Sequence, residues 1–435
     1  MKKTTLLLTI LSVLTLTTQA AYLVVDGSSL SEANADYIGP DAAFPALLVT
    51  NQGYYSGTDG VYTGTYSYPT PGGYGVYVNG TSRADLYGGT ASASSNYKAA
   101  VAVTENSTVN LQDLHLSVTG AMANALILVN ATANIRNVWL TAYNYGDGVN
   151  GSGARLAGEL TGTGLHIDTY GDSSYGIFAD SGATFDLTDV AITTTGSRAR
   201  GIQMINGASG TIRNLAVTTD GLNAQAILFE RPDSSLTVIG GTLQTHNADG
   251  VAMSAYTNGD NQRLNLTDVD IIAASAGLVI NANSSEVHIN GGSIKAGSAL
   301  INASGTGQNE IFLDQVQTAN GDDAVIAGGS VTLTMHTSDM NIGGDLSAND
   351  NANLTLSGSN GTTITGTVSG NDNAIIDLTV SGPGSTILGD ITQSGSSAVT
   401  VIIDNSATGQ GGYNGGNLIT GEDSTWTFNK DSHGN

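Results

Sequence analysis

The chain has 435 residues, with 58 Gly, 6 Pro and no Cys, and its 37 acidic against 13 basic residues give a net charge of −24. The hydrophobic fraction of 40% is enough for a large core, so wholesale disorder is excluded. The lack of Cys excludes disulfide scaffolds and Cys-ligated metal sites. The acidic balance argues against nucleic-acid binding, because such a surface repels a phosphate backbone.

The first twenty residues have the pattern of a secretory signal peptide. Two lysines near the start precede an apolar stretch over residues 6–16, and small residues follow it. We therefore expect residues 1–20 to be removed by cleavage between Ala20 and Ala21. The apolar run is too short to span a membrane comfortably, so we expect an exported chain.

An apolar template of the form Φ-x-Φ-x-x-Φ-x-Φ recurs from about residue 108. Each two-residue alternation predicts a short strand with one buried face, and the additional residue between the two alternations predicts a bend. Four copies are complete: Val109, Leu111, Leu114, Leu116; Ala133, Ile135, Val138, Leu140; Phe185, Leu187, Val190, Ile192; and Leu264, Leu266, Val269, Ile271.

A second apolar element follows these copies at a nearly constant spacing. Its first large apolar residues are Ile177, Ile202, Ile227, Val251, Leu278, Leu300 and Val325. Between them lie turns rich in Asn, Gly, Asp and Ser, which tolerate left-handed backbone conformations. Three short strands per repeat without a helix predict a coil that buries its inner face only by stacking on neighbouring coils.

We therefore predict an all-β fold, a right-handed parallel β-helix (β-solenoid) of roughly a dozen coils. A Tyr/Gly-rich N-terminal cap with the first coils is expected over residues 21–106 and the main β-helix over 107–404. Residues 54–97 hold nine of the 17 tyrosines, and the sequence leaves open whether this segment caps the helix end or forms an adhesive surface. We expect a Gly-rich, flexible break over residues 405–416, at the start of the last segment, 405–435.

The C-terminal run resembles the end of a pertactin-like autotransporter passenger domain. The matching motif is Trp-x-Φ-x-x-x-Ser, here Trp426, Phe428 and Ser432. The resemblance implies that residues 405–435 contain the start of a C-terminal folding module and that residues 107–404 are the passenger β-helix. It also implies a C-terminal β-barrel translocator, which does not follow Asn435, so the chain is expected to be truncated and to need an outer-membrane translocator in trans.

The sequence offers no convincing catalytic, cofactor-binding or metal-binding residues, and we expect none and no enzymatic activity. Asp322 and Asp323 are adjacent on a predicted strand, so their side chains point to opposite faces and cannot pair across a glycosidic bond. Two alternatives remain open: a polysaccharide-degrading β-helix enzyme of the pectin lyase-like type, and a non-functional remnant passenger.

Candidate contact residues come from two segments. In three successive coils, His115, Trp139 and His166 occupy the slot between the last two apolar positions of the template, so they are expected to point outward in a column. Such rings could stack on a sugar or contact a partner. The Tyr-rich segment contributes a second set, Tyr66, Tyr68, Tyr74 and Tyr77.

From the resemblance we expect a noncatalytic rod at the cell surface or in the medium, which acts in adhesion, autoaggregation or biofilm formation. Its expected partners are host-cell or matrix glycans or proteins, or further copies of itself. If no translocator is available, the chain is expected to stay in the periplasm.

Overall fold

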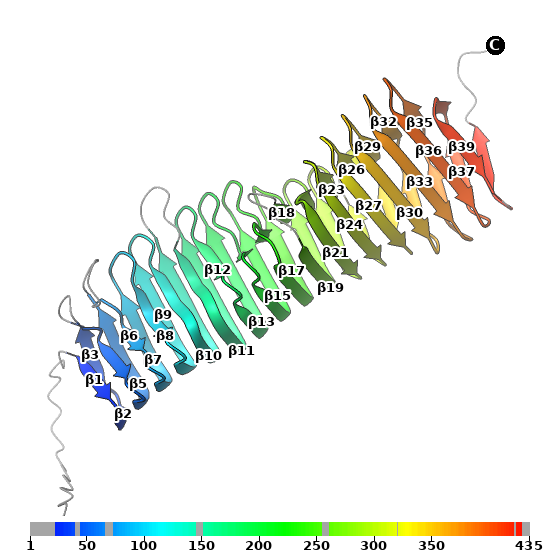
Figure 1. Ribbon diagram of the computed structural model, residues 1–435. Helices are drawn as coiled ribbons and strands as arrows, with labels where there is room; N and C mark the ends of the chain where they lie inside the picture. Colours follow the sequence, from blue (N-terminus) through cyan, green and yellow to red (C-terminus); the bar gives the residue numbers. More distant parts are fainter. Residues whose placement is uncertain are drawn as a thin grey trace, which may run out of the picture.

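The computed structural model describes residues 22–39, 44–65, 73–144, 151–254, 261–319, 321–421 and 423–428. Across them the chain winds into a parallel β-solenoid of about 15 turns, stacked along one axis in chain order (Figure 1). At a strand spacing of about 4.8 Å, such a stack is about 70 Å long. The predicted parallel β-helix is confirmed, with somewhat more coils than expected. The predicted signal peptide, with Ala20 and Ala21, lies outside the described residues.

Each coil contributes strands to three faces, and the strands of each face pair in parallel with the equivalent strands of neighbouring coils. On the third face the pairing is interrupted between β25 (Gln317–Ala319) and β28 (Asn341–Gly343), so the last five strands of that face form a separate sheet. The strands of the first face are β1 (Leu23–Asp26), β4 (Leu47–Thr50), β6 (Val76–Val78), β8 (Ala99–Thr104), the starts of β10 (Asn124–Tyr143) and β11 (Ser152–Tyr170), β12 (Tyr175–Ala179), β14 (Ile202–Met204), β16 (Ile227–Phe229), β18 (Val251–Ser254), β20 (Leu278–Asn281), β23 (Ile301–Ala303), β26 (Asp323–Ala327), β29 (Asp345–Ala348), β32 (Val368–Gly370), β35 (Ile391–Gln393) and β38 (Tyr413–Asn414).

The second and third faces share long bent strands over much of the rod. The bent strands are β5 (Tyr54–Gly64), β7 (Arg83–Ala93), β9 (Thr108–Thr119), β10, β11, β13 (Thr184–Thr195), β15 (Ser209–Thr219), β17 (Ser235–Thr245) and β19 (Gln262–Ala273). The other strands of the second face are β2 (Ser29–Ala33), β21 (Ser284–Asn290), β24 (Gln308–Asp314), β27 (Thr332–Ser338), β30 (Asn353–Ser359), β33 (Ile375–Ser381), β36 (Ala398–Asp404) and β39 (Asn417–Thr420). Those of the third face are β3 (Asp36–Gly39), β22 (Ser293–Ala296), β25 (Gln317–Ala319), β28 (Asn341–Gly343), β31 (Thr363–Thr365), β34 (Thr386–Leu388), β37 (Thr408–Gly411) and β40 (Thr425–Phe428).

A column of left-handed residues makes the bend between the second and third faces. It occupies the second x of the x-x pair in the apolar template, and its members have φ between 50° and 72°: Asp59, Gly88, Asp113, Asn137, Gly164, Asp189, Asn214, Gly240, Asp268, Gly291, Gln315 and Asp339. Asp, Asn and Gly dominate the column because they tolerate this conformation best. Side chains also bond along it, since Asn137 Nδ2 donates to Asp113 Oδ1 at 2.7 Å and Asn214 Nδ2 to Asp189 Oδ1 at 2.7 Å.

The template residues form the core as predicted. Val109, Leu111, Leu114 and Leu116 are at most 1% exposed, and the copies stack on one another, with Leu111 opposite Ile135 and Leu116 opposite Leu140. One position in the predicted stack of second elements was wrong by one residue. The stack of second elements continues from Leu278 to Ile301, not to Leu300, because the preceding turn holds one more residue than the sequence pattern suggested.

The described part of the Tyr-rich segment runs in regular coils, not as an irregular cap. Strand β5 pairs with β7 along both halves of its length. Tyr55 and Tyr62 point into the core, 0% and 1% exposed, and their hydroxyls share a hydrogen bond of 2.9 Å. Glycines on the same strand leave room for these rings, since a Cβ at Gly57 would lie 2.7 Å from the Tyr55 ring.

The prediction of a flexible break over 405–416 is wrong. Strand β37 pairs with β34 on one side and β40 on the other, and β38 pairs with β35. Glycine serves packing here, because Trp426 lies against Gly409 of the preceding coil, where a Cβ would meet the indole at 2.1 Å. The solenoid therefore continues to Phe428, while Ser432 lies outside the described residues.

Candidate functional site

The rings of His115, Trp139 and His166 stack in one column on the outer surface of the third face. They occupy equivalent positions of β9, β10 and β11. The His115 and Trp139 centroids lie 4.6 Å apart with planes 6° from parallel, and those of Trp139 and His166 lie 5.3 Å apart at 11°. Both faces of the indole are therefore covered by imidazoles, and a sugar ring cannot stack on Trp139 as the sequence suggested. The outward ring edges remain available for contact.

A second stack lies four residues further along the same strands. Tyr143 and Tyr170, 38% and 39% exposed, have centroids 4.8 Å apart and planes 9° from parallel. Burial, and then the charge of Asp168, raise the pKa of the Tyr170 phenol above its ordinary value. We call the five rings the aromatic face: His115, Trp139, His166, Tyr143 and Tyr170. It ends abruptly, because the positions next to His166 and Tyr170 in the following coil are Ala191 and Thr195.

Of the tyrosines predicted as contact residues, Tyr74 and Tyr77 do not join this face. Tyr74 and Tyr77 stack on each other at 5.3 Å beside the first face, and the Lys98 ammonium lies 4.7 Å from the Tyr74 ring centroid. Burial raises the pKa of the Tyr74 phenol. Tyr66 and Tyr68 lie outside the described residues. The sequence thus located two separate aromatic groups and missed Tyr143 and Tyr170, although their slot follows the same alternation as Trp139 and His166.

A second imidazole–aromatic–imidazole stack lies on the second face and was not predicted. His288, Phe312 and His336 occupy equivalent positions of β21, β24 and β27, with centroid distances of 4.4 and 4.8 Å. Glu286 Oε1 lies 2.6 Å from His288 Nε2, and its Oε2 lies 2.5 Å from Arg263 Nη2. The hydrogen bond from His288, and then that from Arg263, lower the pKa of the Glu286 carboxyl.

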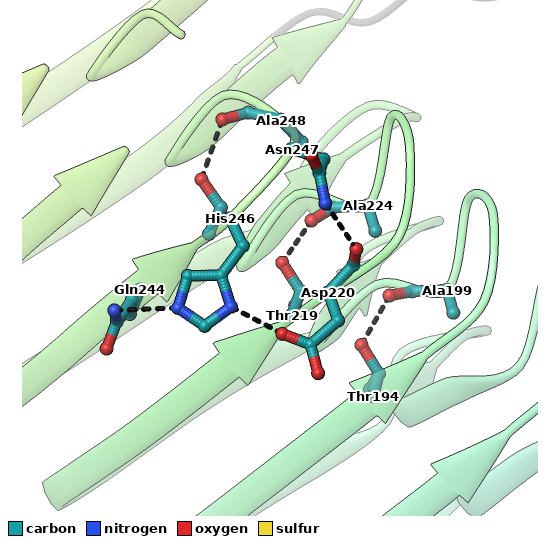
Figure 2. A network of polar contacts seen from close by, with 10 residues as sticks. Thr194, Ala199, Thr219, Asp220, Ala224, Gln244, His246, Asn247 and Ala248 are labelled. Carbon is teal, nitrogen blue, oxygen red and sulfur yellow. Dashed lines mark hydrogen bonds and ion pairs between the residues drawn. The ribbon is translucent and has the colours of Figure 1, made fainter. Parts of the chain in front are cut away.

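One polar network has two of the residue types used in hydrolases. His246 lies between Asp220, which contacts its Nδ1, and Gln244, whose Nε2 lies 2.8 Å from its Nε2, as Figure 2 shows. An amide occupies the place where a hydrolytic triad has its nucleophile, so this network does not constitute an acid–base–nucleophile site. No group of three or more metal-ligating side chains is found within the described ranges.

No family model matches the chain, and no curated protein matches it in sequence. Among solved structures, it is similar to Vag8, an autotransporter passenger, in "The cryo-EM structure of the Vag8-C1 inhibitor complex". The TM-score is 0.57 at 18% identity, over 96% of this chain and 97% of that chain. The chain has the fold of an autotransporter passenger. The pertactin-like resemblance drawn from the repeats and the C-terminal motif is thereby confirmed at the level of the fold. The described residues include no helix of the length and apolarity that a membrane crossing needs.

Proposed function

We propose that this chain is an exported, noncatalytic autotransporter passenger that acts as an adhesin or autoaggregation rod at the cell surface or in the medium. The observation that carries the proposal is the aromatic face, five partly exposed rings gathered within three coils of a passenger-type solenoid. Aromatic side chains supply large contact area at low entropic cost, so such a group is suited to a protein–protein contact.

The stacking geometry favours a protein partner over a sugar for this face. Because the rings cover one another, they present edges, hydroxyls and ring N–H groups to an approaching surface. The structurally similar Vag8 is in complex with a protein, C1 inhibitor. A second copy of this chain, or a host protein, is therefore the partner that we propose.

The export part is tested by fractionation of the native host. Signal at the intact-cell surface or in the medium supports the proposal. Signal confined to the periplasm contradicts it, because a rod held there meets no other cell.

The contact part is tested by cell settling and binding assays on the purified rod. The variant combines Tyr143→Ser and Tyr170→Ser, and the matched control is Leu222→Ala, which removes the most exposed large apolar side chain among the described residues, 66% exposed, from a turn elsewhere. We expect the tyrosine variant to lose settling and the control to keep it. Equal behaviour of the two variants, with unchanged circular dichroism, contradicts the role of the aromatic face.

A further inference from the structure

A groove of about 490 Å³ lies over the outer surface of the first face, between β12 and β20. Its floor is formed by Leu228, Ala252 and Val279, which point outward from β16, β18 and β20. Leu228 and Ala252 are each only 6% exposed although they do not belong to the inner core. The chain segments on both sides of these strands therefore cover the two side chains in part, and the groove between the segments has an apolar floor.

One wall consists of the turns that enter the first face, and buried threonines hold these turns in place. Thr194 Oγ1 donates to the carbonyl of Ala199 at 2.5 Å, and Thr219 Oγ1 donates to that of Ala224, as Figure 2 shows. Thr245 repeats the arrangement with Ala248 at 2.7 Å. The residues that follow or lie within these turns line the groove: Arg198, Arg200, Gln225 and Asp249. Thr194, Thr219 and Thr245 thus make equivalent hydrogen bonds in successive coils beneath this wall. We call these three residues the threonine ladder.

Arginine is concentrated at one end of this groove. Arg200 lies over the ring of Tyr175, with its Cζ 5.6 Å from the centroid, and its Nη1 donates to the Tyr175 hydroxyl at 3.3 Å. The centroids of the Tyr175 and Phe178 rings lie 5.6 Å apart in a stack, and the Cζ of Arg155 lies 5.6 Å from the Phe178 centroid. Arg198 projects from the same turn as Arg200 and is exposed.

These guanidinium groups are not neutralised by the nearby carboxylates. Asp172 accepts the Ser197 N–H at 2.8 Å, Asp249 accepts the Ala276 N–H at 3.1 Å, and Glu230 accepts a hydrogen bond from Gln203 Nε2. Among the described residues, Arg155, Arg198 and Arg200 form no ion pair within 4.0 Å, whereas Arg83, Arg213 and Arg263 each do. Two of these three arginines, Arg198 and Arg200, line the groove, so a chain of net charge −24 places two cations without an acidic partner in one groove.

We propose that this groove binds a carboxylate-bearing sugar, as a unit of an acidic oligosaccharide. Arg198 and Arg200 supply the planar, charged donors that pair with a carboxylate. The apolar floor suits the C–H face of a pyranose. The volume falls within the range of small-ligand sites. The site needs neither the aromatic face nor an adhesive role, so it is independent of the function proposed above.

The opposite wall supplies the groups that recognise sugar hydroxyls. Glu230, Ser254 and Asn281 line it, and Asn281 Oδ1 is buried without a hydrogen-bond partner. The carboxylate, hydroxyl and amide of these three residues are groups that hydrogen-bond to sugar hydroxyls. An acidic peptide would offer the carboxylate but few hydroxyls for this wall, which is why the sugar is the occupant that the groove favours.

The test is calorimetric titration of the folded rod with a galacturonate trimer, with neutral maltotriose and a hexaglutamate peptide as comparison probes. The variants are Arg198→Gln and Arg200→Gln. The matched control is Arg213→Gln, which removes the same charge from a solvent-exposed pair with Asp186 on the second face. Circular dichroism establishes that all variants are folded.

We expect the galacturonate trimer to bind, with affinity that falls as salt is added. Arg200→Gln should weaken binding about tenfold or more, and Arg213→Gln should change it less than about twofold. The proposal is overturned if the trimer does not bind, if maltotriose binds equally well, or if the three variants weaken binding alike. Tighter binding of hexaglutamate than of the trimer overturns the assignment to a sugar.

Discussion

The threonine ladder beneath the groove gives a prediction with an internal comparison. Thr219 is 0% exposed and its hydroxyl donates to the carbonyl of Ala224, for which no backbone donor is found among the residues that the structure describes. Thr245 makes the same bond to Ala248, but that carbonyl also accepts the Ser275 N–H at 3.2 Å. Thr219→Val and Thr245→Val therefore delete the same hydroxyl from two turns that differ in one backbone hydrogen bond.

The expected magnitudes follow from that difference. Valine keeps the volume and the β-branching of threonine, so neither variant leaves a cavity. Thr245→Val loses a hydrogen bond, with a cost of about 1 kcal/mol. Thr219→Val also leaves a buried carbonyl without a donor, which raises the expected cost to about 1–3 kcal/mol. Thr194→Val should resemble Thr219→Val, because within the described part of the chain the Ala199 carbonyl has no other donor either.

Stability should be measured locally, because coils of a solenoid can open in segments. Native-state hydrogen exchange of amides in β16 and β18 gives the free energy of opening for each variant, and the urea midpoint by circular dichroism gives the global effect. If Thr219→Val is no more destabilising than Thr245→Val, the argument that Ala224 depends on the threonine hydroxyl is refuted.

Two further predictions concern other parts of the rod. Burial would raise the pKa of the Asp85 carboxyl, but hydrogen bonds from Arg83, Tyr54 and Asn110, with the Arg83 charge, hold it below its ordinary value. This carboxylate therefore contributes stability above the unfolded-state pKa of about 3.9, and the contribution is lost as pH falls through the lower folded-state pKa. Asp85→Asn should flatten the acid side of the stability profile; an unchanged profile contradicts the assignment. At Gly210 an added Cβ would lie 2.0 Å from Phe185 Cε2 in the core, so Gly210→Ala should lower the free energy of unfolding by about 1–3 kcal/mol. Gly343→Ala is the control for the added methyl group, because Gly343 does not have a left-handed backbone and the nearest atom to its added Cβ would be Thr365 Oγ1 at 4.0 Å; equal effects of the two substitutions would argue against the Phe185 contact.

The inner surface of the rod could be predicted from sequence because strict alternation defines it. The apolar template named the buried positions, and its x-x pair placed the bend at residues such as Asp113 and Asn137. The prediction of a flexible break after residue 404 was wrong because composition alone does not distinguish a flexible loop from a solenoid coil that needs glycine for packing. Gly409 is the clearest case, since its missing side chain makes room for Trp426.

The outer surface could be predicted only in part. The column of His115, Trp139 and His166 could be predicted because these residues lie between the last two apolar positions of the template. His288, Phe312 and His336 lie between the first two apolar positions, and the same reasoning applied there would have predicted the second column. The groove had no such signal. Its strands have continuous apolar runs, as in Ile227-Leu228-Phe229, and periodicity cannot show which residue of such a run points outward.

The column of left-handed corner residues also determines how the rod accommodates changes in length. Spacing from one corner to the next ranges from 23 residues, between Asp268 and Gly291, to 29, between Asp59 and Gly88, yet the strands on either side stay in register. Each corner resets the alignment, so an insertion in one turn does not shift the coils that follow. Segments of new sequence can therefore be added to single turns of this protein while the remaining surface, including any binding site on it, keeps its geometry.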